Sequence, residues 1–405
     1  MSDEQETPSS ASAGGVGTML RELGRKLAKG EAGTLLVLIM VAVIWTFFQL
    51  QNGRFLSPGN LTNLMLQQAA VATISIGVVL ILLLGWIDLS VGAVSGFCAS
   101  VMAVLVVSRH LPSVLAVFIA LALGAFIGLF NGLMTTRFRI PAFIITLAGS
   151  LTLVGLQLYV LGETGTVNLS DPFITGLTNT FFPPLVGWIV AAAAIALTLG
   201  LSLLGRARRQ AAGLQVGPMR ALIFRIAATG AAFAAMVFVV NKDRGLPLVV
   251  VIVIGLTLAM WYLTERTRFG RHLFAIGGNA EAARRAGIKI DHVRIAAFVL
   301  CSTLAAAGGV LAASRLYAVN QSSGASDLVL MAIAGPVVAG TSLFGGRGSV
   351  WTAILGAVVI GSIANGMNLI ALSSSVKFIV TGAVLIVAVT IESVTRMQRR
   401  GTPST

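Results

Sequence analysis

Apolar runs of about 20 residues recur along almost the whole chain, separated by short polar segments. A run of this length, wound as an α-helix, spans the hydrocarbon core of a bilayer. Only 10% of the 405 residues are charged and 56% are hydrophobic, whereas soluble domains carry roughly 25% charged residues. These features predict an all-α, polytopic integral membrane protein and leave no room for a separate soluble domain.

The runs predict a single transmembrane helical bundle of about 10–12 spans over residues 32–395. Residues 1–31 are expected to form a cytoplasmic tail, partly disordered, and residues 396–405 a second cytoplasmic tail. Gly85–Ser90 and Phe344–Ser349 are short joints, so re-entrant or broken helices remain open there. The runs cover residues 32–50, 64–84, 90–108, 113–135, 141–161, 184–204, 220–240, 247–264, 293–313, 328–344, 349–370 and 375–394.

The net charge of +14 would favour a nucleic-acid partner in a soluble protein. In a membrane protein, an excess of Lys and Arg instead marks the cytoplasmic loops. If both termini are cytoplasmic, 21 basic residues fall in inside segments and 6 in outside segments. We therefore predict cytoplasmic termini, contact with membrane lipid and no nucleic-acid partner.

Little in the sequence points to chemistry at the protein's own side chains. Cys98 and Cys301 lie inside apolar runs, and the three histidines are scattered, so no metal site or cofactor is expected. A phosphate-binding loop needs a lysine after its last glycine. The nearest lookalike, Gly340–Ser349, carries Arg347 and no lysine. The chain is therefore not expected to be an enzyme or to hydrolyse ATP itself.

The stretch "FAIGGNAEAARRAGI", within a basic segment over residues 265–292, predicts a short helix with an ending signal at each end. Asn279 is suited to the N-cap, and Glu281 to the first turn, where the helix dipole favours an acid. Gly287 is suited to the left-handed C′ position, and Gly277–Gly278 to a flexible entry. The residues singled out are Asn279, Glu281, Ala282, Ala283, Arg284, Arg285 and Gly287.

Two interpretations of this short helix are open. A helix of about two turns is too short to be stable alone in water, so it must rest on something. It is either part of a basic loop lying on anionic lipid headgroups or a docking element for a cytoplasmic partner.

Small residues recur every four positions in two of the runs and predict close helix packing. They are Gly124, Gly128 and Gly132 in one run, and Ala353, Ala357, Gly361 and Asn365 in the other. Polar amide side chains inside the runs either line a translocation path or bond neighbouring helices. These candidates are Gln67, Gln68, Asn131, Gln157, Asn365 and Asn368.

Four ordered motifs resemble the sugar-transporting permeases of bacterial ATP-binding-cassette (ABC) importers, the ribose, xylose, arabinose and galactose group. The extra material around Arg206–Pro247 is most similar to the xylose members. The motifs are "GWIDLSVGAVSG" (Gly85–Gly96), "NGLMTTRFRIPAFIITLAGSLTLVGL" (Asn131–Leu156), "FGRHLFAIGGNAEAARRAGI" (Phe269–Ile288) and "VVAGTSLFGGRGSVWTAILGAVVIGSIANGMNLI" (Val337–Ile370).

The resemblance implies a subunit of the bacterial inner membrane that imports a monosaccharide, with a pentose such as D-xylose favoured. It implies three partners: an ABC ATPase, a periplasmic sugar-binding protein and a second permease copy. It also implies that Asn279–Gly287 is the coupling helix, which sits in a groove of the ATPase and transmits its movement. The alternative is an ion-coupled secondary transporter of a small polar solute, which usually needs ionisable groups at mid-membrane. Asp88 is one of the few ionisable residues in or near the runs, and it is expected to cap a helix at Val91–Gly92.

Overall fold

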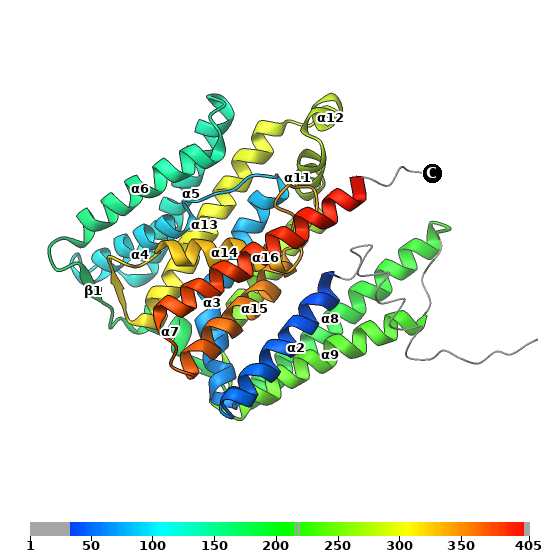
Figure 1. Cartoon of the computed structure of the whole chain (residues 1–405), viewed down its shortest axis with the longest axis horizontal. Helices are drawn as coiled ribbons and strands as arrows, with labels where there is room; N and C mark the ends of the chain where they lie inside the picture. The colour runs from blue at the N-terminus through cyan, green and yellow to red at the C-terminus, as the bar shows by residue number, and fades with distance from the viewer. Residues whose placement is uncertain (1–32, 215, 217–218, 401–405) are drawn as a thin grey trace, which may run out of the picture.

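The structure, a computed structural model, describes residues 33–214, 216 and 219–400, and helices make up most of this part of the chain (Figure 1). Within this part of the chain, seven helices are long and apolar enough to cross a membrane, and five shorter apolar helices accompany them. The fold class, an all-α polytopic membrane protein, is confirmed. The whole predicted N-terminal tail, residues 1–31, lies outside the described residues, as do residues 401–405 of the predicted C-terminal tail.

Each predicted apolar run coincides with one helix. The tenth run was expected to continue to residue 344, but α14 ends at Val338. Gly340, Gly345 and Gly346 take positive φ there, which ends the helix and leaves a loop. The twelve helices are α2 (Gly33–Gln51), α3 (Pro58–Leu83), α4 (Val91–Val107), α5 (Ser113–Arg137), α6 (Ala142–Leu161), α8 (Pro184–Ala211), α9 (Met219–Asn241), α10 (Leu248–Arg266), α13 (Ile290–Leu316), α14 (Ser326–Val338), α15 (Trp351–Leu369) and α16 (Ser374–Arg400).

The two ends of the bundle differ in their connections. One end, here the α12 end, carries the short helices α11 (Arg268–Gly278) and α12 (Ala280–Arg285) and the α5–α6 turn (Figure 1). The opposite end, here the β1 end, carries the short helix α7 (Pro172–Asn179) and two small antiparallel ribbons. The ribbons pair β1 (Thr166–Asn168) with β4 (Ala318–Asn320), and β2 (Phe181–Phe182) with β3 (Leu246–Pro247).

Helix α13 lies at the centre of the bundle, against α3, α4 and α5. The predicted glycine stripe of α5 faces it. A Cβ added at Gly124 would lie 2.7 Å from the carbonyl oxygen of Ser302, and one at Gly128 would fall well inside 3.0 Å of the Phe298 carbonyl. Gly132 meets α13 in the same way, at Ile295. The close packing expected from this stripe is confirmed, and it brings the two backbones into contact.

Replacing Gly128 with leucine should destabilise the bundle, because the backbones of α5 and α13 would have to separate. Overpacking of a tight interior costs about 1–3 kcal/mol and more where backbone must move. The melting temperature of detergent-purified protein checks this. Gly155→Leu on α6 is the matched control, since Gly155 is exposed and nothing lies within 4 Å of a Cβ there. Equal melting temperatures for the two variants would contradict the close crossing.

Candidate functional site

The short helix predicted around residues 279–287 is present as α12, with the expected ending signals. The side chain of Asn279 accepts a hydrogen bond from the Ala282 N–H at 3.0 Å. Gly287 has φ of +81° and donates its N–H to the Arg284 carbonyl at 3.0 Å. Both ends are therefore closed by the residues whose chemistry suits them.

One face of α12 is buried and the other is exposed. Ala283 is 4% exposed and packs in the main core. Glu281 and Arg285 form an ion pair of 3.5 Å on the opposite face, with side chains 62% and 80% exposed. At this exposure the pair contributes little to stability. The protein thus presents a short, charged and capped helix at the surface of the α12 end.

Helix α11, which precedes α12, was not predicted. Gly277 and Gly278 were expected to be a flexible entry, and that expectation is wrong, since both belong to α11. The helix is held by the buried side chains of Leu273 and Ile276. Its last turn also touches the core backbone: a Cβ at Gly277 would collide with the carbonyl oxygen of Leu83.

Two other connectors meet α11 at this point. The loop between α14 and α15 donates the Gly346 N–H to the Leu83 carbonyl at 2.9 Å. A Cβ at Gly345 would lie 2.7 Å from the nitrogen of Gly85 and 2.9 Å from the carbonyl oxygen of Gly277. Backbone therefore touches backbone where the α3–α4 connector, the α14–α15 loop and α11 come together, and we call this the glycine junction.

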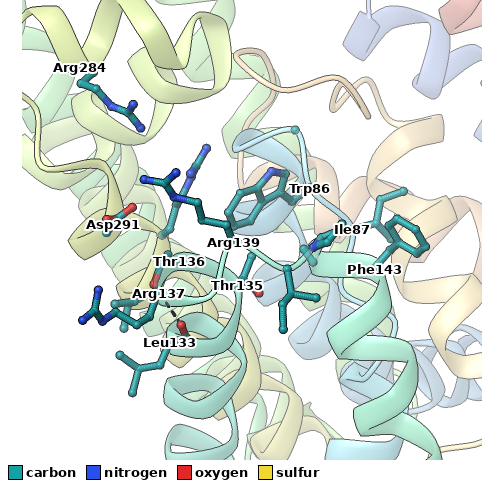
Figure 2. A pocket seen from close by; sticks show the side chains of 16 residues that line it. Trp86, Ile87, Leu133, Thr135, Thr136, Arg137, Arg139, Phe143, Arg284 and Asp291 are labelled. Carbon is teal, nitrogen blue, oxygen red and sulfur yellow. Dashed lines mark hydrogen bonds between the residues drawn. The ribbon is translucent and has the colours of Figure 1, made fainter.

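A cavity of about 680 Å³ opens beside α12 (Figure 2). It lies between the α3–α4 connector, the α5–α6 turn and the start of α13. Polar and basic side chains, including Arg139, Arg284 and Asp291, lie on one side of the view, and Ile87 and Phe143 lie on the other. The cavity is therefore two-sided in chemistry, basic on one wall and apolar on the other.

The six amide residues proposed for a translocation path lie in separate places. Near the β1 end, Asn365 donates to Gln67 at 3.4 Å and accepts from Asn60 at 2.8 Å. Gln68 fills the space left by Gly361, and its Oε1 is buried with no hydrogen-bond partner in the part of the chain that the structure describes. This group joins α3 to α15.

The remaining three amides bond elsewhere. Asn131 donates to the Ser90 hydroxyl at 3.2 Å. Gln157 donates to the backbone carbonyls of Asn320 and Ser323, at 2.9 and 3.0 Å. Asn368 accepts from Lys377 at 2.5 Å. None of the six lines the cavity beside α12, and their place in a translocation path stays a prediction.

Asp88 does not cap the helix at Val91–Gly92 as expected, but stabilises the α3–α4 connector. Its Oδ1 accepts from the backbone N–H and the hydroxyl of Ser90, at 2.8 and 2.6 Å, instead of from Val91–Gly92. The reason is local: the loop returns on itself over two residues, an Asx-type turn that brings Ser90 nearest. Through Ser90, this turn also contacts Asn131 of α5.

Comparison with known proteins decides the family. The chain matches the family described as branched-chain amino acid transport system / permease component, over residues 60–248 and 240–389. The chain belongs to this permease family. Its helical bundle and its multi-pass placement in the membrane agree with that membership.

Named relatives of the permease are similar over nearly its full length. The xylose transport system permease protein XylH of Escherichia coli K12 is 34% identical over 89% of this chain and 92% of its own. XylH of Haemophilus influenzae is 32% identical over 91% and 98%. The ribose import permease protein RbsC of Escherichia coli K12 is 29% identical over 90% and 93%. No solved structure gave a significant match.

Sequence reasoning missed the packing of Trp86 against Arg294 in this permease. The guanidinium carbon lies 4.2 Å from the ring centroid, a cation–π contact. The motif that contains Trp86 was recognised, but the partner lies over 200 positions later in the sequence. Only the tertiary fold brings the two together.

Proposed function

We propose that the chain is the membrane-spanning subunit of an ABC importer that carries a monosaccharide, D-xylose first among pentoses, into the cytoplasm. The likeness to XylH over 89% of the chain supports this choice, and the likeness to RbsC supports a pentose more generally. The chain's lack of a phosphate-binding loop fits a subunit whose ATP is hydrolysed by a partner.

Helix α12 is the element that we assign to the ATPase contact. Its outer face carries the exposed pair Glu281 and Arg285, whereas Arg284 lines the cavity beside the helix. The caps of the helix fix its orientation. Its inner face and the preceding α11 are attached to the core at Ala283 and at the glycine junction. A rigid, surface-exposed helix of this kind fits a groove in a partner and passes the partner's movement to the bundle.

The remaining partners follow from the same assignment. The α12 end faces the cytoplasm and the ATPase, and the β1 end faces the periplasm and a sugar-binding protein. A second copy of the chain completes the importer. ATP-driven closure of the ATPase shifts α12 and rocks the bundle between outward-open and inward-open states.

Uptake of labelled D-xylose by proteoliposomes tests the function. With the ATPase, the binding protein and internal ATP, uptake should exceed that with a non-hydrolysable ATP analogue, and excess unlabelled xylose should compete better than ribose. If ribose competes better than xylose, ribose and not xylose is the preferred substrate. Uptake by the chain alone, driven by an imposed ion gradient, would overturn the importer assignment in favour of a secondary transporter.

The orientation has its own test. In a chain lacking the buried Cys98 and Cys301, a cysteine replacing exposed Ala286 should resist a membrane-impermeant maleimide added to intact cells. It should react after the cells are opened. The matched control is a cysteine replacing exposed Ser170 near the β1 end, which should react in intact cells. The reverse labelling pattern would invert the orientation.

A further inference from the structure

The cavity beside α12 has a surplus of positive charge. Four arginines line it, namely Arg137, Arg139, Arg284 and Arg294, and the acidic residue that lines it is Asp291. The ion pairs found among the described residues, Arg244–Asp243 and Arg285–Glu281, involve none of the four. Their guanidinium groups therefore keep N–H donors that are not used in ion pairs within the described residues.

Arg294 is the best-placed of these donors. Trp86 holds its guanidinium by the cation–π contact at 4.2 Å. Its Nε is buried and has no hydrogen-bond partner among the described residues. A buried, unsatisfied N–H is costly, more so on a charged group. The Arg294 side chain also lines the cavity, where its guanidinium can donate to a ligand with anionic oxygens, because Arg binds phosphate through paired N–H donors.

The opposite wall of the cavity is apolar and open. Ile87 and Phe143 line it and are 37% and 55% exposed. A free phosphate would gain nothing from these side chains. A ligand that carries a phosphate at one end and hydrocarbon at the other would cover both walls.

The depth of the cavity in the membrane agrees with such a ligand. Arg137 is the last residue of α5, and Arg139 lies in the turn before α6. Both helices are apolar and long enough to span, so their shared turn lies at the level of the lipid headgroups. Basic pockets between transmembrane helices at this level are suited to anionic phospholipids.

We propose that this cavity binds the phosphate of an anionic phospholipid, with Arg139, Arg284 and Arg294 around the phosphate and the acyl chains along Ile87 and Phe143 (Figure 2). The bound phosphate joins α12 to the α5–α6 turn. The site is separate from the proposed sugar path and does not depend on which sugar is carried.

Native mass spectrometry of the purified, delipidated chain tests the site, with dioleoyl phosphatidylglycerol titrated against dioleoyl phosphatidylcholine. Phosphatidylglycerol should bind more tightly to the wild type. Arg139→Gln and Arg294→Gln should each weaken that binding by about tenfold, the expected loss of one charge-assisted hydrogen bond. Arg271→Gln is the matched control, since Arg271 is exposed on α11 and does not line the cavity. It should bind as the wild type does.

Three outcomes would overturn the proposal. The first is equal binding of the two lipids, and the second is an equal loss in Arg271→Gln, which would mean a general surface charge effect. The third is inorganic phosphate displacing phosphatidylglycerol at millimolar concentration, which would make the ligand a free phosphate. A Phe143→Gln variant further distinguishes a phospholipid from a free phosphate as the ligand. It should weaken the binding of phosphatidylglycerol and leave the binding of inorganic phosphate unchanged. Normal melting temperatures establish that the variants are folded.

Discussion

Gly277→Ala should lower sugar uptake severely, although it adds a single methyl group. A Cβ at this position would collide with the Leu83 carbonyl oxygen and lie 2.6 Å from the nitrogen of Gly346. Both obstacles are backbone atoms, so no side-chain rotation can relieve the clash. The expected cost is at least the roughly 1–3 kcal/mol typical of overpacking. This corresponds to a roughly five- to 150-fold shift in the equilibrium between the closed and the opened junction.

The neighbouring glycine provides the control. Gly278→Ala places its methyl group where nothing lies within 4 Å, in the same helix and with the same change in helix propensity. Uptake of labelled xylose and the melting temperature should fall in Gly277→Ala and stay near the wild type in Gly278→Ala. If both variants transport and melt alike, the glycine junction is not a tight contact.

Glu281→Lys and Gly287→Val should both abolish ATPase binding while leaving insertion in the membrane normal. The first change puts a positive charge at the N-terminus of α12, which loses about 0.3–1 kcal/mol from the helix dipole. It also breaks the pair with Arg285 and reverses the charge offered to a docking groove. The second change forces a β-branched residue into φ of +81°, at roughly 1–2 kcal/mol.

Co-purification of the ATPase with tagged permease measures the effect, together with xylose uptake. Gly287→Asn is the control, because asparagine tolerates the left-handed conformation and should retain most of the binding. Wild-type co-purification and uptake in both Glu281→Lys and Gly287→Val would leave α12 as a basic surface loop without a coupling role. Loss of binding in Gly287→Asn as well would mean that backbone strain is not the cause.

The elements that could be predicted are those whose cause lies in neighbouring residues. Apolar runs of spanning length predicted every long helix, because hydrophobicity and length alone decide such elements in a bilayer. The caps of α12 were also predictable, since Asn279 and Gly287 act on backbone groups within a few positions. The glycine stripe of α5 predicted a close helix crossing, but the sequence did not indicate that α13 is the partner helix.

What could not be predicted depends on residues far apart in the chain. Helix α11 contains several glycines and basic residues, and it is ordered because Leu273 and Ile276 are buried in the core. The amide residues looked equivalent in sequence, yet Gln157 bonds a loop near Asn320 and Asn131 bonds Ser90. The cavity is lined by the α3–α4 connector, the α5–α6 turn, α12 and the start of α13, and none of these four segments predicts it alone.

The position of α13 limits where the protein can bend. This helix follows α12 directly, and its backbone is in close contact with α5 at Gly128 and with α4 at Gly309. Such contacts contain no layer of side chains that could compress or change rotamer. A displacement of α12 therefore carries α13, α4 and α5 along as one block. Any hinge must therefore lie at the edge of that block and not between α13 and the two helices packed on it.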